Sequence, residues 1–303
     1  MSSDSAPPLA PGLYLVATPI GNLGDITLRA LDVLKRVDRI ACEDTRQTQK
    51  LLNHFQIDTP TESLHEHNEH ERTPLLIEAL KAGKRIAIVT DAGMPGISDP
   101  GALLTAAAVD AGIPVIPIPG ANAALSGLVA SGLPSAAFTY LGFLPEKAGQ
   151  RRTRLEQIAQ QSADAPRTVI FYEAPHRIIE MLADLEAVFG PELRTVVARE
   201  LTKVHEEFLR GAVSEVRQQI AERDRIRGEM TVIIELPEAK QGSILVSRAN
   251  IGDHVARLQA QLGIDEKEAL KRLAREMNRS KSELYRELQR ERAGQRRRST
   301  AAG

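Results

Sequence analysis

Short apolar runs alternate with helical patterns of apolar residues along the chain as far as Pro134. Apolar runs predict strands over 13–17, 39–42, 86–89 and 115–118, and apolar residues at helical spacing predict helices over 28–37, 47–55, 69–80, 102–109 and 121–129. Where strands alternate with helices, each helix returns the chain across one face of the sheet, so neighbouring strands run parallel. The sequence therefore predicts an α/β fold with a parallel N-terminal sheet covered on both faces.

The alternation changes after Pro134, where we place the boundary between two α/β domains. Strands are expected over 138–143, 169–172, 196–198, 206–209 and 230–236, and helices over 154–161, 176–189 and 213–221. Strands now follow strands, so the second sheet should be mixed. Together these patterns predict a disordered leader over 1–12, an N-terminal domain over 13–134 and a second domain over 135–237.

A small helical appendage is expected after the two α/β domains. Charged helical patterns cover 251–262, 267–277 and 282–290, which predicts a helical domain over 249–292 and a basic tail over 293–303. From Asp265 to Gly303 there are 12 Lys or Arg against 7 Asp or Glu, a net charge of +5. A basic end of this kind favours nucleic acid as a partner, although it is also typical of a solvated tail.

Composition excludes several protein classes. The single cysteine, Cys42, excludes an intramolecular disulfide and a Cys-rich metal site, which favours the reducing cytoplasm. The leader has neither a basic start nor an apolar stretch, so a secretory signal is not expected. Residues 111–145 carry no charge, but prolines and glycines interrupt them, so they predict a buried strand and helix rather than a membrane span.

The loop TDAGMPGISDPG, residues 90–101, follows the apolar run 85–89. Asp99 favours the cap of a helix and Pro100 its first position, so a helix should begin at Pro100 or Gly101 and leave backbone N–H groups free at the strand end. Gly93 and the nearby Gly96 allow a ligand to approach the backbone closely. Asp91 could accept a hydrogen bond from a ligand hydroxyl or amine, or it could simply cap a turn.

Two further loops, 17–24 and 117–122, also follow predicted parallel strands, so all three can meet at one cleft. The fingerprints G-x-G-x-x-G and G-x-x-x-x-G-K-[ST] are missing, which weighs against dinucleotide and P-loop nucleotide binding. The stretch 65–70, HEHNEH, has potential metal ligands, but a polar turn at a helix start explains it at least as well. We therefore expect no metal site.

Six motifs in this order resemble a known family. They are ATPIGNL (17–23), CEDTR (42–46), HEHN (65–68), DAGMPGISDPG (91–101), FYEAPHR (171–177) and RELTK (199–203), the last followed by HEE (205–207). The chain from about Leu13 to Leu236 resembles the bacterial small-subunit ribosomal RNA methyltransferases of the tetrapyrrole methylase superfamily. Its helical end is similar to the small C-terminal domain of that family.

The resemblance implies a two-domain tetrapyrrole methylase-like fold and a homodimer that binds S-adenosylmethionine between its domains. It implies methylation of the ribose 2′-hydroxyl of a cytidine in the decoding centre of 16S ribosomal RNA, with no membrane or DNA as a partner. The cofactor-binding residues expected in the loops and the second domain are Pro19, Gly21, Asp91, Gly93, Pro95, Gly96, Ile97, Ser98, Pro119, Gly120, Ala121 and Tyr172.

A ribose hydroxyl is a poor nucleophile until its proton leaves, so a base is needed within hydrogen-bond distance. We expect it among Glu173, His176 and Lys203. Arginines would grip RNA phosphates, which sets affinity without reading sequence. The expected RNA-binding residues, three of them in the basic stretch 147–154, are Arg46, Arg151, Arg152, Arg154 and Arg177.

Two other functions remain open on the sequence. A small-molecule methyltransferase acting on a tetrapyrrole ring would have an apolar cleft and no need of the basic tail. A ribosome- or RNA-binding protein without enzymatic activity would bind RNA but not S-adenosylmethionine.

Overall fold

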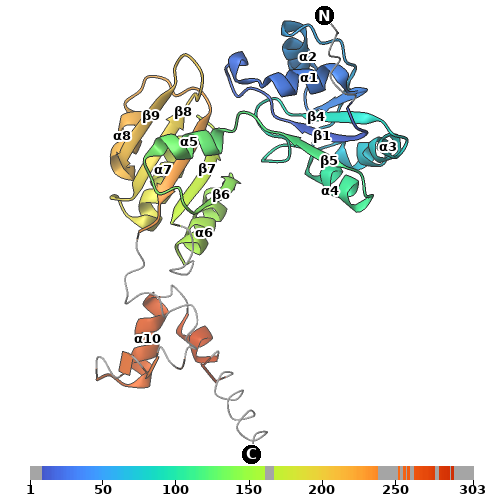
Figure 1. The fold of residues 1–303 in the computed structure, drawn as a ribbon. Helices are drawn as coiled ribbons and strands as arrows, with labels where there is room; N and C mark the ends of the chain where they lie inside the picture. Colours follow the sequence, from blue (N-terminus) through green and yellow to red (C-terminus); the bar gives the residue numbers. More distant parts are fainter. Residues whose placement is uncertain are drawn as a thin grey trace, which may run out of the picture. The chain divides into compact units, whose positions relative to one another are not determined.

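The computed structural model describes residues 9–160 and 167–237 and, in the C-terminal part, residues 252, 255–256, 258–259, 263–276, 280–286 and 288–289. The chain divides into two compact units. The first unit holds two five-stranded sheets and the second the C-terminal helices (Figure 1). The leader 1–8 and the basic tail 293–303 lie outside the described residues.

The first sheet is parallel throughout and has the strand order β3-β2-β4-β1-β5. Its strands are β1 (Gly12–Val16), β2 (Arg39–Cys42), β3 (Thr61–Ser63), β4 (Arg85–Val89) and β5 (Val115–Ile118). The helices between them are α1 (Leu28–Arg36), α2 (Thr45–His54), α3 (Glu69–Lys81) and α4 (Ala102–Asp110), with a short 3-10 turn at Leu23–Asp25. The expected parallel sheet is confirmed.

Two apolar layers cover this sheet. On one face, Val33 and Leu34 of α1 and Leu52 of α2 pack on the strands. On the other face, Leu76 of α3 and Leu104 of α4 do so. Figure 1 shows the helices on both sides of β1 and β4. Because β4 is covered on both faces, its residues 86–89 are all buried, which explains an apolar run without alternation.

The second sheet has the order β6-β7-β10-β8-β9, with β6 parallel to β7 and the remaining neighbours antiparallel. Its strands are β6 (Phe138–Phe143), β7 (Thr168–Glu173), β8 (Arg194–Arg199), β9 (Glu207–Ala212) and β10 (Met230–Glu235). Its helices are α6 (Ala148–Ala159), α7 (Ile178–Phe189) and α8 (Val213–Ala221). The expected mixed sheet is confirmed.

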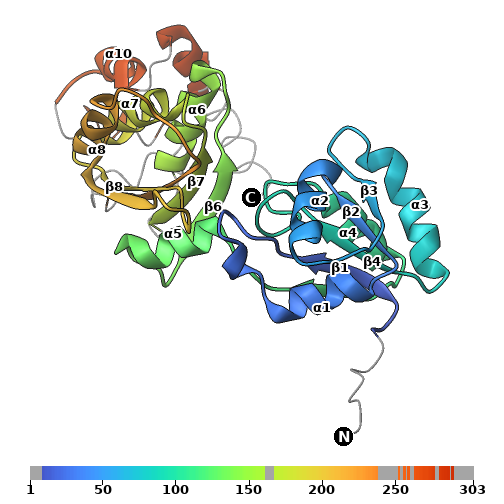
Figure 2. The same ribbon diagram turned by 90° about the horizontal axis from the view of Figure 1, so that it is seen from above.

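Helix α5 (Ala123–Ser131) packs on the second sheet, although it precedes the boundary expected near Pro134. Its Ala124 and Leu128 lie against Ile170, Val196 and Ile233 of the sheet. Helices α6, α7 and α8 cover the opposite face (Figure 2). The chain therefore passes from the first sheet to the second before α5 begins.

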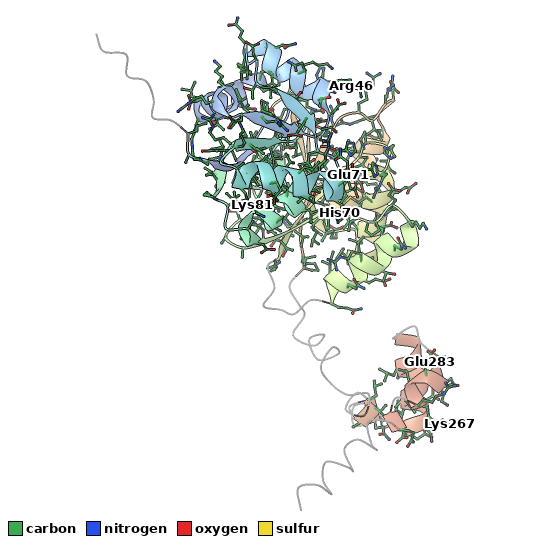
Figure 3. All side chains as sticks on the ribbon, turned by 90° about the vertical axis from the view of Figure 1, so that its right-hand side faces the viewer. Arg46, His70, Glu71, Lys81, Lys267 and Glu283 are labelled. Atoms are coloured by element: carbon green, nitrogen blue, oxygen red, sulfur yellow. The ribbon has the colours of Figure 1, made fainter. Side chains whose placement is uncertain are left out.

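The C-terminal unit has a small core of its own. Val255, Leu270 and Leu273 are among its buried residues, and the two leucines belong to α10 (Glu266–Glu276). Charged side chains such as Lys267 and Glu283 are exposed around this core (Figure 3). Within the described parts of the chain, no helix is long and apolar enough to cross a membrane.

Candidate functional site

Backbone pairing ties together the loops that follow the parallel strands. Thr18, after β1, donates its N–H to the carbonyl of Gly93 at 2.9 Å, and Gly93 donates back to Thr18 at 3.1 Å. The Thr18 hydroxyl also donates to the Thr90 carbonyl at 3.0 Å. After β2, the Asp44 N–H donates to Asp91 Oδ1 at 3.3 Å. From the third predicted loop, the Ile118 carbonyl accepts a hydrogen bond from the Ala17 N–H at 3.2 Å, so the three loops meet at the carboxyl edge of the sheet as predicted.

A cavity of about 400 Å³ lies beside these loops and is lined from both sheets. This volume falls within the usual range of small-molecule sites, about 300–1,000 Å³. Its lining residues include Ile20, Glu43, Asp91, Gly93, Ile97, Ser98, Asp99 and Asn122 of the first sheet's loops and Phe143, Tyr172, Glu173, Leu201, Glu229 and Thr231 of the second.

A hydroxyl contact joins the two walls of the cavity, and aromatic contacts build the wall on the second sheet. Ser98 Oγ and Tyr140 Oη lie 2.7 Å apart, and the rings of Tyr140 and Tyr172 meet edge to face with centroids 5.3 Å apart. Tyr172 Oη accepts a hydrogen bond from the Ala124 N–H at 3.2 Å. Phe143, half exposed, meets Tyr172 at 5.8 Å. An aromatic wall therefore faces the glycine-rich loops.

The residues expected to bind the cofactor divide into two groups. Those that line the cavity are Asp91, Gly93, Ile97, Ser98 and Tyr172. The others, which lie in the same loops but outside the lining as far as the chain is described, are Pro19, Gly21, Pro95, Gly96, Pro119, Gly120 and Ala121. Their cofactor contacts stay a prediction.

Close packing explains why two positions outside the lining are occupied by glycine. A Cβ on Gly21 would lie 2.4 Å from Cγ of Lys203, so Gly21 leaves room for the lysine stem. A Cβ on Gly120 would lie 2.8 Å from Cβ of Ala17, so Gly120 lets two loops pass each other. These glycines serve the assembly of the site's walls.

The prediction that Asp99 caps the helix after its own loop, α4, is wrong. The helix begins at Ala102, and its free N–H groups are satisfied by Glu69 of α3 rather than by Asp99. Glu69 Oε1 accepts from the N–H groups of Gly101 at 3.0 Å, Leu103 at 3.2 Å and Leu104 at 3.4 Å. A carboxylate there also complements the positive end of the helix dipole. Asp99 is thereby free to line the cavity.

The variant Glu69→Ala should lower the free energy of unfolding by about 1 kcal/mol, the usual cost of a lost cap. Glu69→Gln should cost less, because the amide oxygen still accepts hydrogen bonds. Urea denaturation would measure both. The matched control is Glu71→Ala in the same turn of α3, where the side chain is exposed (Figure 3). Equal losses at positions 69 and 71 would contradict the assignment.

The described lining carries carboxyl groups and no lysine or arginine. Burial raises the pKa of Glu43, and the charge of Asp91 adds to the effect. Burial likewise raises the pKa of Asp91, against the hydrogen bond from Asp44. Burial and then the charges of Glu43, Asp91 and Glu229 raise the pKa of Asp99 to about 7. The cavity therefore favours a ligand with positive charge and hydrogen-bond donors.

Of the three residues expected to supply the base, Glu173 lines the cavity. Its side chain is fully buried, and burial raises its pKa, opposed by the hydrogen bond from the Ala174 N–H and by the charge of Arg177. The other oxygen, Oε2, is buried without a hydrogen-bond partner. His176 is exposed and, like Lys203, lies outside the lining as far as the chain is described.

Lys203 is placed to hold the loop rather than to take a proton. Its Nζ donates to Glu200 Oε1 at 2.7 Å and to Glu229 Oε2 at 2.9 Å. Burial alone would lower the pKa of Lys203, but these two partners outweigh it and the pKa is raised. The ammonium therefore stays protonated at neutral pH, which removes the support for Lys203 as a base.

Two of the arginines expected to grip RNA are structural. Arg151 is 1% exposed and donates to Asp184 Oδ2 at 2.6 Å. Arg177 donates to the Leu144 carbonyl at 2.7 Å and faces Glu173, with Nε 3.1 Å from Oε1. Neither guanidinium can reach a phosphate without leaving these partners, so both assignments are corrected.

The remaining three arginines are accessible. Arg152 is ion-paired with Asp184 at 2.5 Å but its side chain is 59% exposed. Arg154 lies on the exposed face of α6. Arg46, at the start of α2, is 87% exposed and pairs with Asp44 at 3.1 Å (Figure 3). RNA contact through these residues stays a prediction.

The cavity suits S-adenosylmethionine on the residues present. Its carboxylates match a sulfonium cation and an amino group, and the wall of Phe143 and Tyr172 matches a flat base. Gly93 has room around its backbone, with Ile20 Cγ2 the nearest atom to a built Cβ at 3.5 Å. Glu173 Oε2 lacks a donor that a polar ligand can supply.

Comparison with known proteins places the chain in a family. The family described as Tetrapyrrole (Corrin/Porphyrin) Methylases matches residues 12–217. Ribosomal RNA small subunit methyltransferase I of Synechocystis is 47% identical over 90% of this chain and 95% of its own length, and that of Bacillus subtilis is 44% identical over 90% and 92%.

A solved structure shows the same fold at low identity. Cobalt precorrin-4 methyltransferase matches with a TM-score of 0.54 at 16% identity, over 74% of this chain and 94% of its own. The family match and the ribosomal RNA methyltransferase relatives show that the chain belongs to the tetrapyrrole methylase family and is a methyltransferase that uses S-adenosylmethionine.

Proposed function

We propose that this chain methylates the ribose 2′-hydroxyl of a cytidine in the decoding centre of 16S ribosomal RNA. The observation that carries the proposal is the 44–51% identity to relatives named ribosomal RNA small subunit methyltransferase I, which in the Synechocystis and Bacillus subtilis proteins spans 90% of this chain. The motif FYEAPHR, residues 171–177, supports it because it supplies Tyr172 and Glu173 to the cavity.

The walls of the cavity have three tasks in this reaction. S-adenosylmethionine supplies an electrophilic methyl group on its sulfonium. The carboxylates around the cavity favour that cation, the loops of both sheets align it with the ribose hydroxyl, and the aromatic wall limits access of water. These tasks depend largely on positioning, which agrees with a lining made mostly of small and aliphatic residues, with acidic groups among them.

We place the enzyme in the cytoplasm and propose that it acts as a homodimer. The single cysteine suits a reducing compartment. Leu125 and Val129, one turn apart on α5, are 47% and 76% exposed, and such an apolar face favours a second copy. Size-exclusion chromatography with light scattering measures the assembly directly, and a monomer at micromolar concentration would reject the homodimer.

The deciding experiment is transfer of labelled methyl from S-adenosylmethionine to small ribosomal subunits from cells that lack the activity. Mapping of the modified nucleotide should place the label on the ribose of a cytidine in the decoding region. Label on a base, or on another nucleotide, would reject the proposed substrate. A labelled tetrapyrrole with unlabelled RNA would instead show a small-molecule methyltransferase.

Removal of residues 249–303 should weaken binding to small-subunit RNA by about tenfold or more at low salt, because each lost phosphate contact removes a salt-dependent share of the affinity. Binding of S-adenosylmethionine should persist, because both sheets lie in the other unit. Filter binding and calorimetry measure the two affinities. Equal loss of both would indicate misfolding rather than a role in RNA binding.

A further inference from the structure

The carboxyl group of Asp99 has no partner within the part of the chain that is described. Glu69 satisfies the N–H groups at the start of α4, and no hydrogen bond or ion pair there engages Asp99. The residue is half-buried and lines the cavity. A partly buried carboxylate without a partner opposes folding. Its place in the wall of a ligand cavity therefore points to a function there.

The groups around Asp99 come from both sheets. Glu43 follows β2, Asp91 follows β4 and Glu229 precedes β10, and all three lie close enough for their charges to act on Asp99. Asp99 in turn raises the pKa of two neutral hydroxyls, those of Tyr140 and Tyr172, after the larger effect of their burial. Because Asp99 is partly buried and has three acidic neighbours, it takes up a proton readily.

Glu173 gives a second, independent sign of a ligand in this cavity. It is 2% exposed, and its Oε2 has no hydrogen-bond partner although it lies in the lining. Oε1 is occupied by the Ala174 N–H and faces Arg177. Glu173 is almost fully buried, whereas Asp99 is half-buried and closer to solvent. Glu173 therefore suits a hydrogen bond to a ligand, and Asp99 suits proton transfer.

We propose that Asp99 accepts the proton of the ribose 2′-hydroxyl during methyl transfer. The inference rests on the proposed function. The ribose O2′ forms a bond to the methyl carbon while the bond from that carbon to sulfur breaks, and the electron pair of the broken bond stays on sulfur. The hydroxyl proton passes to the Asp99 carboxylate and from there to solvent. The products are the 2′-O-methyl ribose and S-adenosylhomocysteine.

The test compares Asp99→Asn, Asp99→Glu and Glu173→Gln in single-turnover methylation of small ribosomal subunits from pH 5.5 to pH 9. Since the carboxylate is the active form, the wild-type rate should fall as pH drops through the pKa of Asp99, about 7. Asp99→Asn should lower the single-turnover rate by about 100-fold or more, the usual contribution of a general base. The decrease of the rate at low pH, the acid limb of the profile, should also be absent in this variant. Asp99→Glu should recover part of the rate and keep an acid limb.

Two measurements without turnover accompany the rates. Carbon NMR of aspartate-labelled enzyme should show one carboxyl that titrates near 7 and is missing in Asp99→Asn. Calorimetry should show that this variant still binds S-adenosylmethionine, so that the rate is compared at saturating methyl donor and its loss is not a loss of binding. A wild-type rate in Asp99→Asn, or an acid limb lost only in Glu173→Gln, would overturn the inference. If Asp99→Asn stayed active and the label were still on the ribose, the role of Asp99 would be rejected and the proposed function would stand. Label outside the ribose would reject both the proposed function and the role of Asp99.

Discussion

The variant Asp184→Ala should lower the free energy of unfolding by about 3 kcal/mol or more, the cost of leaving a buried charge without its partner. The carboxylate of Asp184 is 3% exposed and joins two arginines, Arg151 at 2.6 Å and Arg152 at 2.5 Å. Arg151 is itself 1% exposed, and of its two carboxylate partners only Asp184 is buried with it. Urea denaturation followed by circular dichroism measures the change.

Glu180→Ala is the matched control, because it removes the other carboxylate that pairs with Arg151. Glu180 lies 3.2 Å from the same guanidinium but is 70% exposed, so its loss should cost about 0–1 kcal/mol. The double variant Arg151→Met with Asp184→Leu should recover most of the stability, since apolar residues often replace a buried ion pair without cost. Equal losses for Asp184→Ala and Glu180→Ala would refute the buried pair.

The same pair explains why the basic stretch 147–154 misled the sequence interpretation. By charge alone, Arg151 and Arg154 look equally suited to bind phosphate. Their positions in the helix distinguish them, because Arg151 shares the inward face of α6 with Leu155 and Ile158, at spacings of four and seven residues. That periodicity was visible in the sequence once α6 was extended back from the expected start at 154 to Ala148.

The elements of the fold were largely predictable, because periodicity depends on local burial. Strand β5 and helix α8 have the bounds expected from the sequence. Strand β3, Thr61–Ser63, was missed, because three polar, half-buried residues at the edge of a sheet carry no apolar signal. The placement of α5 on the second sheet could not be predicted either, because it depends on which apolar surface that helix meets.

The residues of the site that directly follow strands could be predicted from the sequence. The residues whose role depends on partners far away in the sequence could not. Asp91 and Gly93 follow β4 directly, so the sheet itself places them at the cavity. Asp99 carried a strong capping signal, and only Glu69, thirty residues earlier in the chain, takes that task from it. Phe143 and Glu229 reach the cavity from the second sheet, and no local pattern marks them.

The variant Gly93→Leu should weaken binding of S-adenosylmethionine by about 100-fold or more, on the order of 3 kcal/mol. Gly93 lines the cavity, and a Cβ there would lie 3.5 Å from Ile20 Cγ2, so a longer side chain fills space that the ligand needs. Its backbone has φ +89°, where side chains are strained, so a loss of stability accompanies any substitution. Calorimetry with S-adenosylmethionine measures the affinity.

Gly83 offers a control with a similar positive φ, away from the cavity that Gly93 lines. Its φ is +83°, it is exposed in the turn between α3 and β4, and no heavy atom lies within 4 Å of a built Cβ. Gly83→Ala and Gly93→Ala should each cost about 1–2 kcal/mol of stability from the left-handed backbone. Only the position-93 series should lose affinity, and the loss should grow from Ala to Leu as the side chain lengthens. If Gly83→Leu reduced the affinity as much as Gly93→Leu, strain rather than occupied space would be the cause, and Gly93 would have no direct part in holding the methyl donor.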